Sequence, residues 1–150
     1  MDRRRFLFAS LAGALAAPLA AEAQQAKVPR IGALLLSAPQ ERFHESFGEG
    51  LRELGYIEGQ TVLVEYRSVT AGQADRLLDL ATQLVRLKVD VIVAYTTLSG
   101  DAAKRATAEI PIVAIAADPV GTGLVASLAR PGGNVTGLSS THCRPWWKTS

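Results

Sequence analysis

The chain has 150 residues, of which 48% are hydrophobic and 20% charged, with 16 basic and 14 acidic side chains. This length predicts a single core, and the near balance of charge excludes the basic surface of a nucleic-acid-binding or membrane-surface protein. Cys143 is the only cysteine, and the two histidines lie far apart in the sequence. We therefore expect neither an intrachain disulfide nor a metal site.

Residues 1–23 have the pattern of an export signal peptide. Three arginines precede an apolar run over 6–21, and the run closes on the small-x-small sequence Ala21-Glu22-Ala23. The run is shorter than the roughly 20 residues that a membrane-spanning helix needs. We expect cleavage after Ala23 and a periplasmic protein, exported by the twin-arginine or the general secretion route.

The segments that follow alternate between strand and helix patterns. Residues 30–37 are a continuous apolar run, which is typical of a buried strand. Four apolar residues from Phe43 to Leu54 then form one stripe of an amphipathic helix, and Gly55 is expected to terminate it. Residues 61–68 alternate in polarity and predict a second strand.

The second half of the chain continues the alternation. A helix with an apolar face is predicted over 77–87. Short apolar strands are predicted over 89–94, 110–116 and 134–137.

Two shorter helices are predicted between these strands. The first covers residues 99–109, with Thr97 or Ser99 as its N-terminal cap. The second covers 121–129, where a run of proline and glycine stops it. Apolar strands that alternate with helices indicate a parallel sheet covered on both faces. The fold class is therefore α/β, a doubly wound parallel sheet, for which the right-handed crossover rule favours the strand order 2-1-3-4-5.

In such a sheet, ligands bind beyond the carboxyl ends of the strands. The segments that follow the apolar strands are 37–39, 95–97 and 117–119. We expect binding residues to come from these three segments.

A glycine pattern in the last of these units suggests a cofactor at first sight. Gly121, Gly123 and Ala126 have the G-x-G-x-x-A spacing of a dinucleotide-binding turn. That turn belongs in the first strand–helix unit, with an acidic residue about 20 positions later to hold the ribose. Here it falls in the fourth unit, and no acid lies near Thr141. We therefore expect no cofactor, and glycines that shape a sharp turn.

Several longer stretches resemble a known family. The segments "VPRIGALLLS", "FGEGLRELGYIEGQTVLVEYRS" and "DPVGTGLVASLARPGGNVTGLSS" closely resemble exported substrate-binding proteins of ABC transporters. The resemblance is to the group with a type I periplasmic-binding fold that includes binders of tryptophan and other aromatic amino acids. It covers the signal peptide and residues 28 to about 140.

The resemblance implies a function and a domain organisation. Members of the family have two α/β lobes that close on a small solute, and they deliver it to permease subunits in the membrane. Residues 24–140 match the N-terminal lobe. Residues 141–150, "THCRPWWKTS", depart from the family pattern, so we expect an aberrant or disordered tail on a truncated protein. The implied partners are an amino-acid-like solute and the permease, without nucleic acid and with no membrane contact except through the permease.

Five residues are candidates for binding a zwitterionic solute. Thr96 and Thr97, with the backbone N–H groups that follow them, are expected to hold a carboxylate. Asp118 is expected to receive an ammonium group. Ser37 adds a hydroxyl, and Tyr95 is expected to cover an apolar or aromatic side chain.

Each candidate has an alternative structural role. The hydroxyl groups can cap a helix or a turn, Asp118 can cap the turn before Gly121, and Tyr95 can pack at the rim. An alternative function, an exported hydrolase or isomerase that uses Asp118, also stays open. The sequence offers no G-x-S-x-G elbow and no histidine beside an acid at a strand end, so we expect a protein that is not an enzyme.

Overall fold

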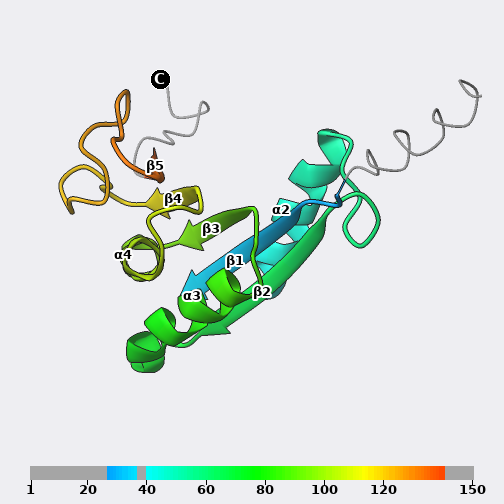
Figure 1. Cartoon of the computed structure of the whole chain (residues 1–150), viewed down its shortest axis with the longest axis horizontal. Coiled ribbons are helices and arrows are strands. Elements are labelled where there is room, and N and C mark those ends of the chain that lie inside the picture. Colours follow the sequence, from blue (N-terminus) through cyan, green and yellow to red (C-terminus); the bar gives the residue numbers. More distant parts are fainter. Residues whose placement is uncertain (1–26, 37–39, 141–150) are drawn as a thin grey trace, which may run out of the picture.

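The computed structural model describes residues 27–36 and 40–140. The predicted signal peptide, Ser37 and residues 141–150 lie outside this part. Five parallel strands form one sheet in the order β2-β1-β3-β4-β5, which confirms the predicted fold class and strand order (Figure 1). The strands are β1 (Arg30–Leu36), β2 (Leu63–Val69), β3 (Val91–Tyr95), β4 (Ile112–Ala116) and β5 (Val135–Ser139).

Within the described residues, three α-helices accompany the sheet: α2 (Gln40–Glu53), α3 (Leu77–Arg86) and α4 (Thr97–Ala106). A 3-10 helix, η1 (Ala71–Arg76), leads into α3 and was not predicted from the sequence. In Figure 1, α3 and α4 lie on one side of the sheet and α2 lies on the other.

The face of the sheet under α3 and α4 forms the main core. Side chains that point to this face include Leu34, Ala94 and Ala114, none of which is exposed. The helices contribute Leu77, Ala81 and Leu84 of α3, and Ala102 and Ala103 of α4. Small residues on the strands let α4 lie close to the sheet: a Cβ on Gly100 would stand 3.2 Å from Cβ of Ala114. We call this side the covered face.

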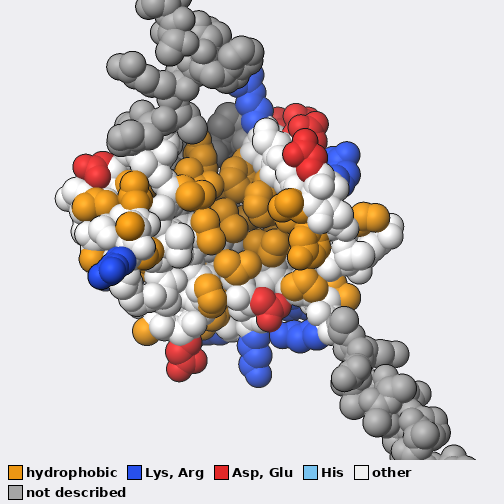
Figure 2. Space-filling model, turned by 90° about the horizontal axis from the view of Figure 1, so that it is seen from above, with side chains coloured by type: hydrophobic (Ala, Val, Ile, Leu, Met, Phe, Trp, Pro, Cys, Tyr) orange, Lys and Arg blue, Asp and Glu red, His pale blue; other side chains and the backbone are white. Residues whose placement is uncertain are grey.

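The opposite side, which we call the open face, is covered only in part among the described residues. Phe43, Phe47 and Leu51 of α2 are half-buried, and Phe43 packs against Tyr95 at the end of β3. Leu138 of β5, by contrast, is 52% exposed. Figure 2 looks onto the side that carries α2 and shows hydrophobic side chains gathered in a hollow.

Helix α2 ends as predicted at Gly55, but one residue of its stripe was assigned wrongly. Gly55 has a φ of +86°, and the N–H of Tyr56 donates to the carbonyl of Leu51 at 2.8 Å. This left-handed arrangement is the Schellman motif that glycine favours. Leu54 was placed on the apolar stripe, yet it lies after the last helical residue and is 75% exposed.

The helix predicted over 121–129 does not form. The segment is a series of turns, in which Gly123 has a φ of +75° and the Thr122 hydroxyl donates to the carbonyl of Asp118 at 2.7 Å. Two glycines within three residues cost a helix about 1 kcal/mol each, and local hydroxyl bonds compete with the helical ladder. Leu124 and Val125 are nonetheless buried in the core, so this segment contributes to the core without forming a helix.

No helix within the described residues combines the length and apolar character needed to cross a membrane.

Candidate functional site

The carboxyl ends of β3, β4 and β5 surround a cavity of about 220 Å³. Three of the five predicted site residues line it: Tyr95, Thr96 and Thr97. The remaining lining residues are Ile115, Ala116, Ala117 and Ser140. Because these strands are parallel, their ends meet at one edge, and this brings together residues that are 45 positions apart in the sequence. The sequence analysis missed Ser140, although its position directly after β5 is the same signal that identified the other segments.

Thr96 connects β3 to α4 through an unusual backbone conformation. Its φ of 99° and ψ of 158° lie in a region that residues with a Cβ rarely adopt. Its N–H donates to the carbonyl of Ile115 at 2.9 Å, and its carbonyl accepts from Gly100 at 3.1 Å. Hydrogen bonds on both sides therefore hold the strained residue in place.

The side chain of Thr96 serves the helix. Its hydroxyl oxygen accepts from the N–H of Ser99 at 3.4 Å and donates to Oγ of Ser99 at 3.2 Å. Thr96 is thus the N-cap of α4, and the cap predicted at Thr97 or Ser99 was misplaced by one or more residues. Ser99 is fully buried, so the cap also satisfies its hydroxyl. The alternative structural role of Thr96, that of a helix cap, is therefore the role of its hydroxyl group in this structure.

Thr97 is the first residue of α4, at the mouth of the cavity. Because Ser99 and Gly100 donate to Thr96, the N–H groups of Thr97 and Leu98 have no acceptor within the helix. The start of a helix also carries a partial positive charge. This part of the cavity therefore favours an anionic group such as a carboxylate.

The Tyr95 ring forms an aromatic part of the cavity and is 38% exposed. It lies edge-on to the ring of Phe43 in α2, with ring centroids 5.6 Å apart and an interplanar angle of 61°. Phe43 in turn stacks on Phe47 at 5.4 Å. The sequence analysis did not connect Phe43 with this site, because only the fold brings α2 over the end of β3.

Asp118 lies just beyond the cavity and caps a turn. Its Oδ1 accepts from the N–H of Gly121 at 2.8 Å, the alternative role that the sequence had left open. A Cβ at Gly121 would overlap the Asp118 carboxylate, so a larger residue there would displace the side chain that caps the turn. Lys104 of α4 holds the same loop by donating to the carbonyl of Gly123 at 3.0 Å. Asp118 is exposed and is not among the residues that line the cavity.

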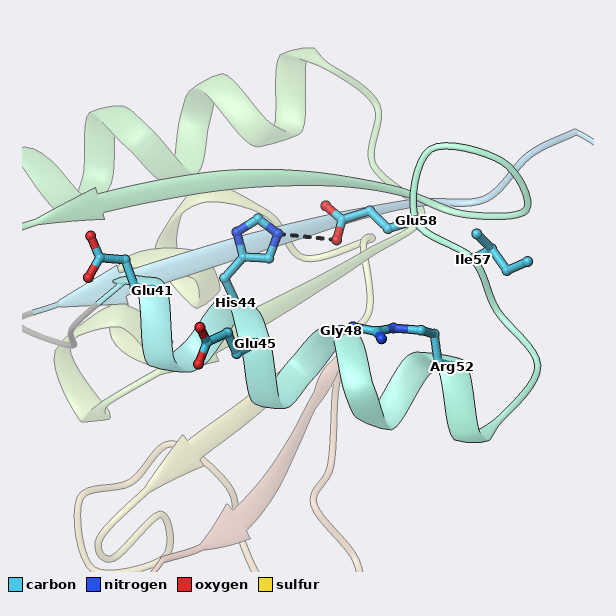
Figure 3. A pocket seen from close by; sticks show the side chains of 7 residues that line it. All are labelled: Glu41, His44, Glu45, Gly48, Arg52, Ile57 and Glu58. Atoms are coloured by element: carbon cyan, nitrogen blue, oxygen red, sulfur yellow. Dashed lines mark ion pairs between the residues drawn. The ribbon is translucent and has the colours of Figure 1, made fainter.

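A larger hollow of about 450 Å³ lies along α2 (Figure 3). It is lined mainly by polar side chains from α2 and the loop before β2: Glu41, His44, Glu45, Arg52 and Glu58, with Gly48 and Ile57. Nε2 of His44 lies 3.3 Å from Oε2 of Glu58, to which the Tyr66 hydroxyl donates at 3.4 Å. Burial, together with the charge and the hydrogen bond of Glu58, raises the pKa of Tyr66 to about 12.

The smaller cavity is the better candidate for the functional site. The hollow along α2 extends toward the start of β2 and consists of exposed side chains, of which His44 and Glu58 are paired with each other. The smaller cavity lies at the carboxyl edge, where parallel sheets bind ligands, and combines helix N–H groups, hydroxyl groups and an aromatic ring. Within 27–36 and 40–140, no group of three or more metal-ligating side chains is close enough to hold a metal ion.

The chain is similar to known proteins over most of its described length. The sequence model of the ABC transporter substrate binding protein family matches residues 36–144. A protein described as a tyrosine-binding protein of Clostridioides difficile is 36% identical over 100 residues, which are 66% of this chain and 29% of that protein.

Solved structures agree with the sequence similarity. A conserved domain protein from Vibrio cholerae superposes with a TM-score of 0.69 at 33% identity. A ligand-free, open substrate-binding protein from Clostridium difficile gives 0.68 at 30%. A Streptococcus protein solved in complex with L-Trp gives 0.68 at 28%. Each comparison covers 75% of this chain and 39% of the other, so the chain spans about two fifths of these relatives.

Proposed function

Because the chain belongs to the family of ABC transporter substrate-binding proteins, we propose that residues 24–140 are the N-terminal lobe of a solute-binding protein of an ABC importer. The solute is an amino acid or a similar small zwitterion, and the permease subunits of the importer are the partner. The leader sequence supports export to the periplasm. The protein binds its solute and does not transform it.

The observation that carries this proposal is the start of α4 at the cavity edge. The N–H groups of Thr97 and Leu98, with the Thr97 hydroxyl, match the needs of a carboxylate. Tyr95 supplies an apolar surface beside them. Relatives described as tyrosine-binding and as bound to L-Trp support an amino acid as the ligand.

We further propose that Asp118 receives the ammonium group of the solute. Its Oδ1 accepts one hydrogen bond from Gly121, and a carboxylate has further lone pairs for a second donor. Ser37 stays a predicted hydroxyl contact outside the described residues.

The enzyme alternative has no observation in its favour. Asp118 is engaged in a turn, and His44 lies on α2 beside Glu58.

Binding by one lobe should be weak. A solute that binds with a micromolar dissociation constant has a binding free energy of about 8 kcal/mol. Half of this free energy, about 4 kcal/mol, corresponds to a dissociation constant near 1 mM. Since the chain spans 39% of its structural relatives, we propose that it supplies one wall of a cleft and roughly half of the contacts.

Titration of the isotope-labelled chain with phenylalanine, followed by NMR, tests the function. We expect a dissociation constant of about 1 mM, with the largest amide shifts at Thr97, Leu98 and Ala117. Phenethylamine, which lacks the carboxylate, should cause no shifts at Thr97. Thr97→Val keeps the shape of the side chain and should weaken phenylalanine binding. Amide shifts confined to the hollow along α2 would reject the proposal. So would the absence of shifts at a phenylalanine concentration roughly ten times the expected dissociation constant.

The same titration tests Asp118. Asp118→Asn should weaken the binding of phenylalanine. The binding of phenylpropionate, which lacks the ammonium group, should stay unchanged. Equal weakening of both ligands would mean that Asp118 acts only through its turn.

A further inference from the structure

Four side chains form a row across the open face at the carboxyl end of the sheet. The strand register places Leu35, Tyr95, Ile115 and Leu138 opposite one another. Tyr95 and Ile115 both line the cavity. Tyr95 is the last residue of β3, so the strand fixes its backbone but leaves its ring to be placed by its neighbours.

Phe43 is the aromatic neighbour of this ring. It reaches Tyr95 from α2 in an edge-to-face arrangement, with 5.6 Å between the ring centroids, within the favoured range for aromatic pairs. Its other side stacks on Phe47, so Phe43 is itself held from behind. Phe43 does not line the cavity; any effect on a solute must pass through Tyr95.

The rest of the apolar lining offers little that is specific. Ile115, Ala116 and Ala117 are aliphatic and accept any apolar group of suitable size. An aromatic wall distinguishes among such groups, because a planar ring packs against it in stacked or edge-on geometry and a branched aliphatic chain does not. A ring held in place before binding also avoids the entropy cost of ordering it.

We propose that Phe43 is a positioning residue that fixes the Tyr95 ring as one wall of the cavity, and that this wall selects solutes with planar side chains. The inference rests on the proposed function, since it concerns the same cavity. It adds a residue on α2, outside the cavity, to the determinants of specificity.

The test compares two solutes of similar solubility, phenylalanine and leucine, titrated into the whole 150-residue chain by NMR. We expect phenylalanine to bind about fivefold more tightly than leucine, in line with the strength of an aromatic pair. Phe43→Leu should lower this ratio to about one, and Phe43→Tyr, which keeps the ring, should restore it.

Two controls separate positioning from general loosening of α2. Leu51→Ala weakens the packing of the same helix stripe but does not touch Tyr95, so the ratio should stay near fivefold. Tyr95→Leu removes the wall and leaves every residue of α2 unchanged, so it should abolish the ratio; this tests the wall even where Phe43→Leu unfolds the chain.

The possible failures are distinguishable. If Phe43→Leu leaves the affinity ratio of phenylalanine to leucine unchanged, even with weaker binding of both solutes, the inference is overturned and the proposed function stays intact. The same holds where the unaltered chain binds both solutes equally. If neither solute binds the unaltered chain, the proposed function and the inference are overturned together.

Discussion

The two faces of the sheet have similar apolar sequences and very different surroundings. On the covered face, Leu34, Ala94 and Ala114 form a row in which every side chain is fully buried. On the open face, the adjacent row begins with Leu35, also fully buried, and continues through Tyr95 at 38% exposure to Leu138 at 52%. The two ends of the row therefore differ in cover, and Ile115, between Tyr95 and Leu138, is partly buried. Apolar alternation shows that a strand has a buried side, but the neighbouring elements decide how far along the sheet the cover extends.

The largest expected effect comes from the covered face. Leu34→Ala should lower the free energy of unfolding by about 2–5 kcal/mol, because it removes a fully buried side chain and leaves a cavity between β1 and its helices. Urea denaturation measures the change. Leu54→Ala, at a leucine that is 75% exposed, should change it by less than about 0.5 kcal/mol. Similar losses in both variants would contradict the assigned core.

A smaller effect is expected where the covered face meets the turn after Asp118. A Cβ on Gly137 would stand 2.8 Å from Cβ of Pro119 and 3.2 Å from Val125. Gly137→Ala should therefore destabilise the chain by about 1–3 kcal/mol through overpacking, although alanine normally stabilises a strand relative to glycine. Thr136→Ala, one residue earlier on the exposed side, serves as the matched control. A gain in stability for Gly137→Ala would show that the turn is packed loosely.

The covered face was largely predictable from sequence, and the reasons are local. Apolar runs and, for β2, alternating polarity identified the strands, and the crossover rule favoured the order β2-β1-β3-β4-β5 that the structure has. Gly55 marked the end of α2 correctly because a left-handed helix end requires glycine. The failed helix over 121–129 shows the limit: Leu124 and Val125 are buried, but two glycines and local hydroxyl bonds favour turns.

The candidate site was predictable only as a set of strand ends. The rule for parallel sheets identified Tyr95, Thr96 and Thr97, which the structure brings together. It did not distinguish contact from support: the Thr96 hydroxyl caps α4, a role that depends on a φ of 99° that no sequence pattern specifies. The contact of Phe43 with Tyr95 spans two elements and depends on where α2 lies, which periodicity does not reveal.

The pH dependence of stability tests whether α2 covers the edge of the open face at β2. Tyr66 lies opposite Ala33 on this face, and its ring lies 4.4 Å from that of His44 in α2. Its pKa is raised from 10.0 to about 12, mainly by burial. Above pH 10 the unfolded chain releases the phenolic proton while the folded chain keeps it. The stabilising contribution is thus complete below pH 10 and is lost as the pH rises toward 12.

The expected size of this effect is moderate. The full shift corresponds to about 2.7 kcal/mol, and partial exposure of the phenol reduces it to about 1 kcal/mol. Urea denaturation of the unaltered chain and of Tyr66→Phe between pH 9 and 11.5 isolates the tyrosine, because the other titrating groups are common to both. Parallel pH profiles would mean that α2 does not bury Tyr66.

The smallest expected effect lies at the far end of the open row, at Leu138. Leu138→Thr keeps a side chain suited to a strand and removes apolar surface that is already half in water. The free energy of unfolding should therefore change by no more than about 0.5 kcal/mol. Leu35→Thr, in the same row but fully buried, should cost several times more, because it places a hydroxyl in an apolar site. The two variants share a face, a row and a substitution, so the comparison reports mainly on how far each side chain is covered. Urea denaturation that gives equal losses would mean that the open face is covered at β5 as well as at β1, and the contrast between the two ends of the row would disappear.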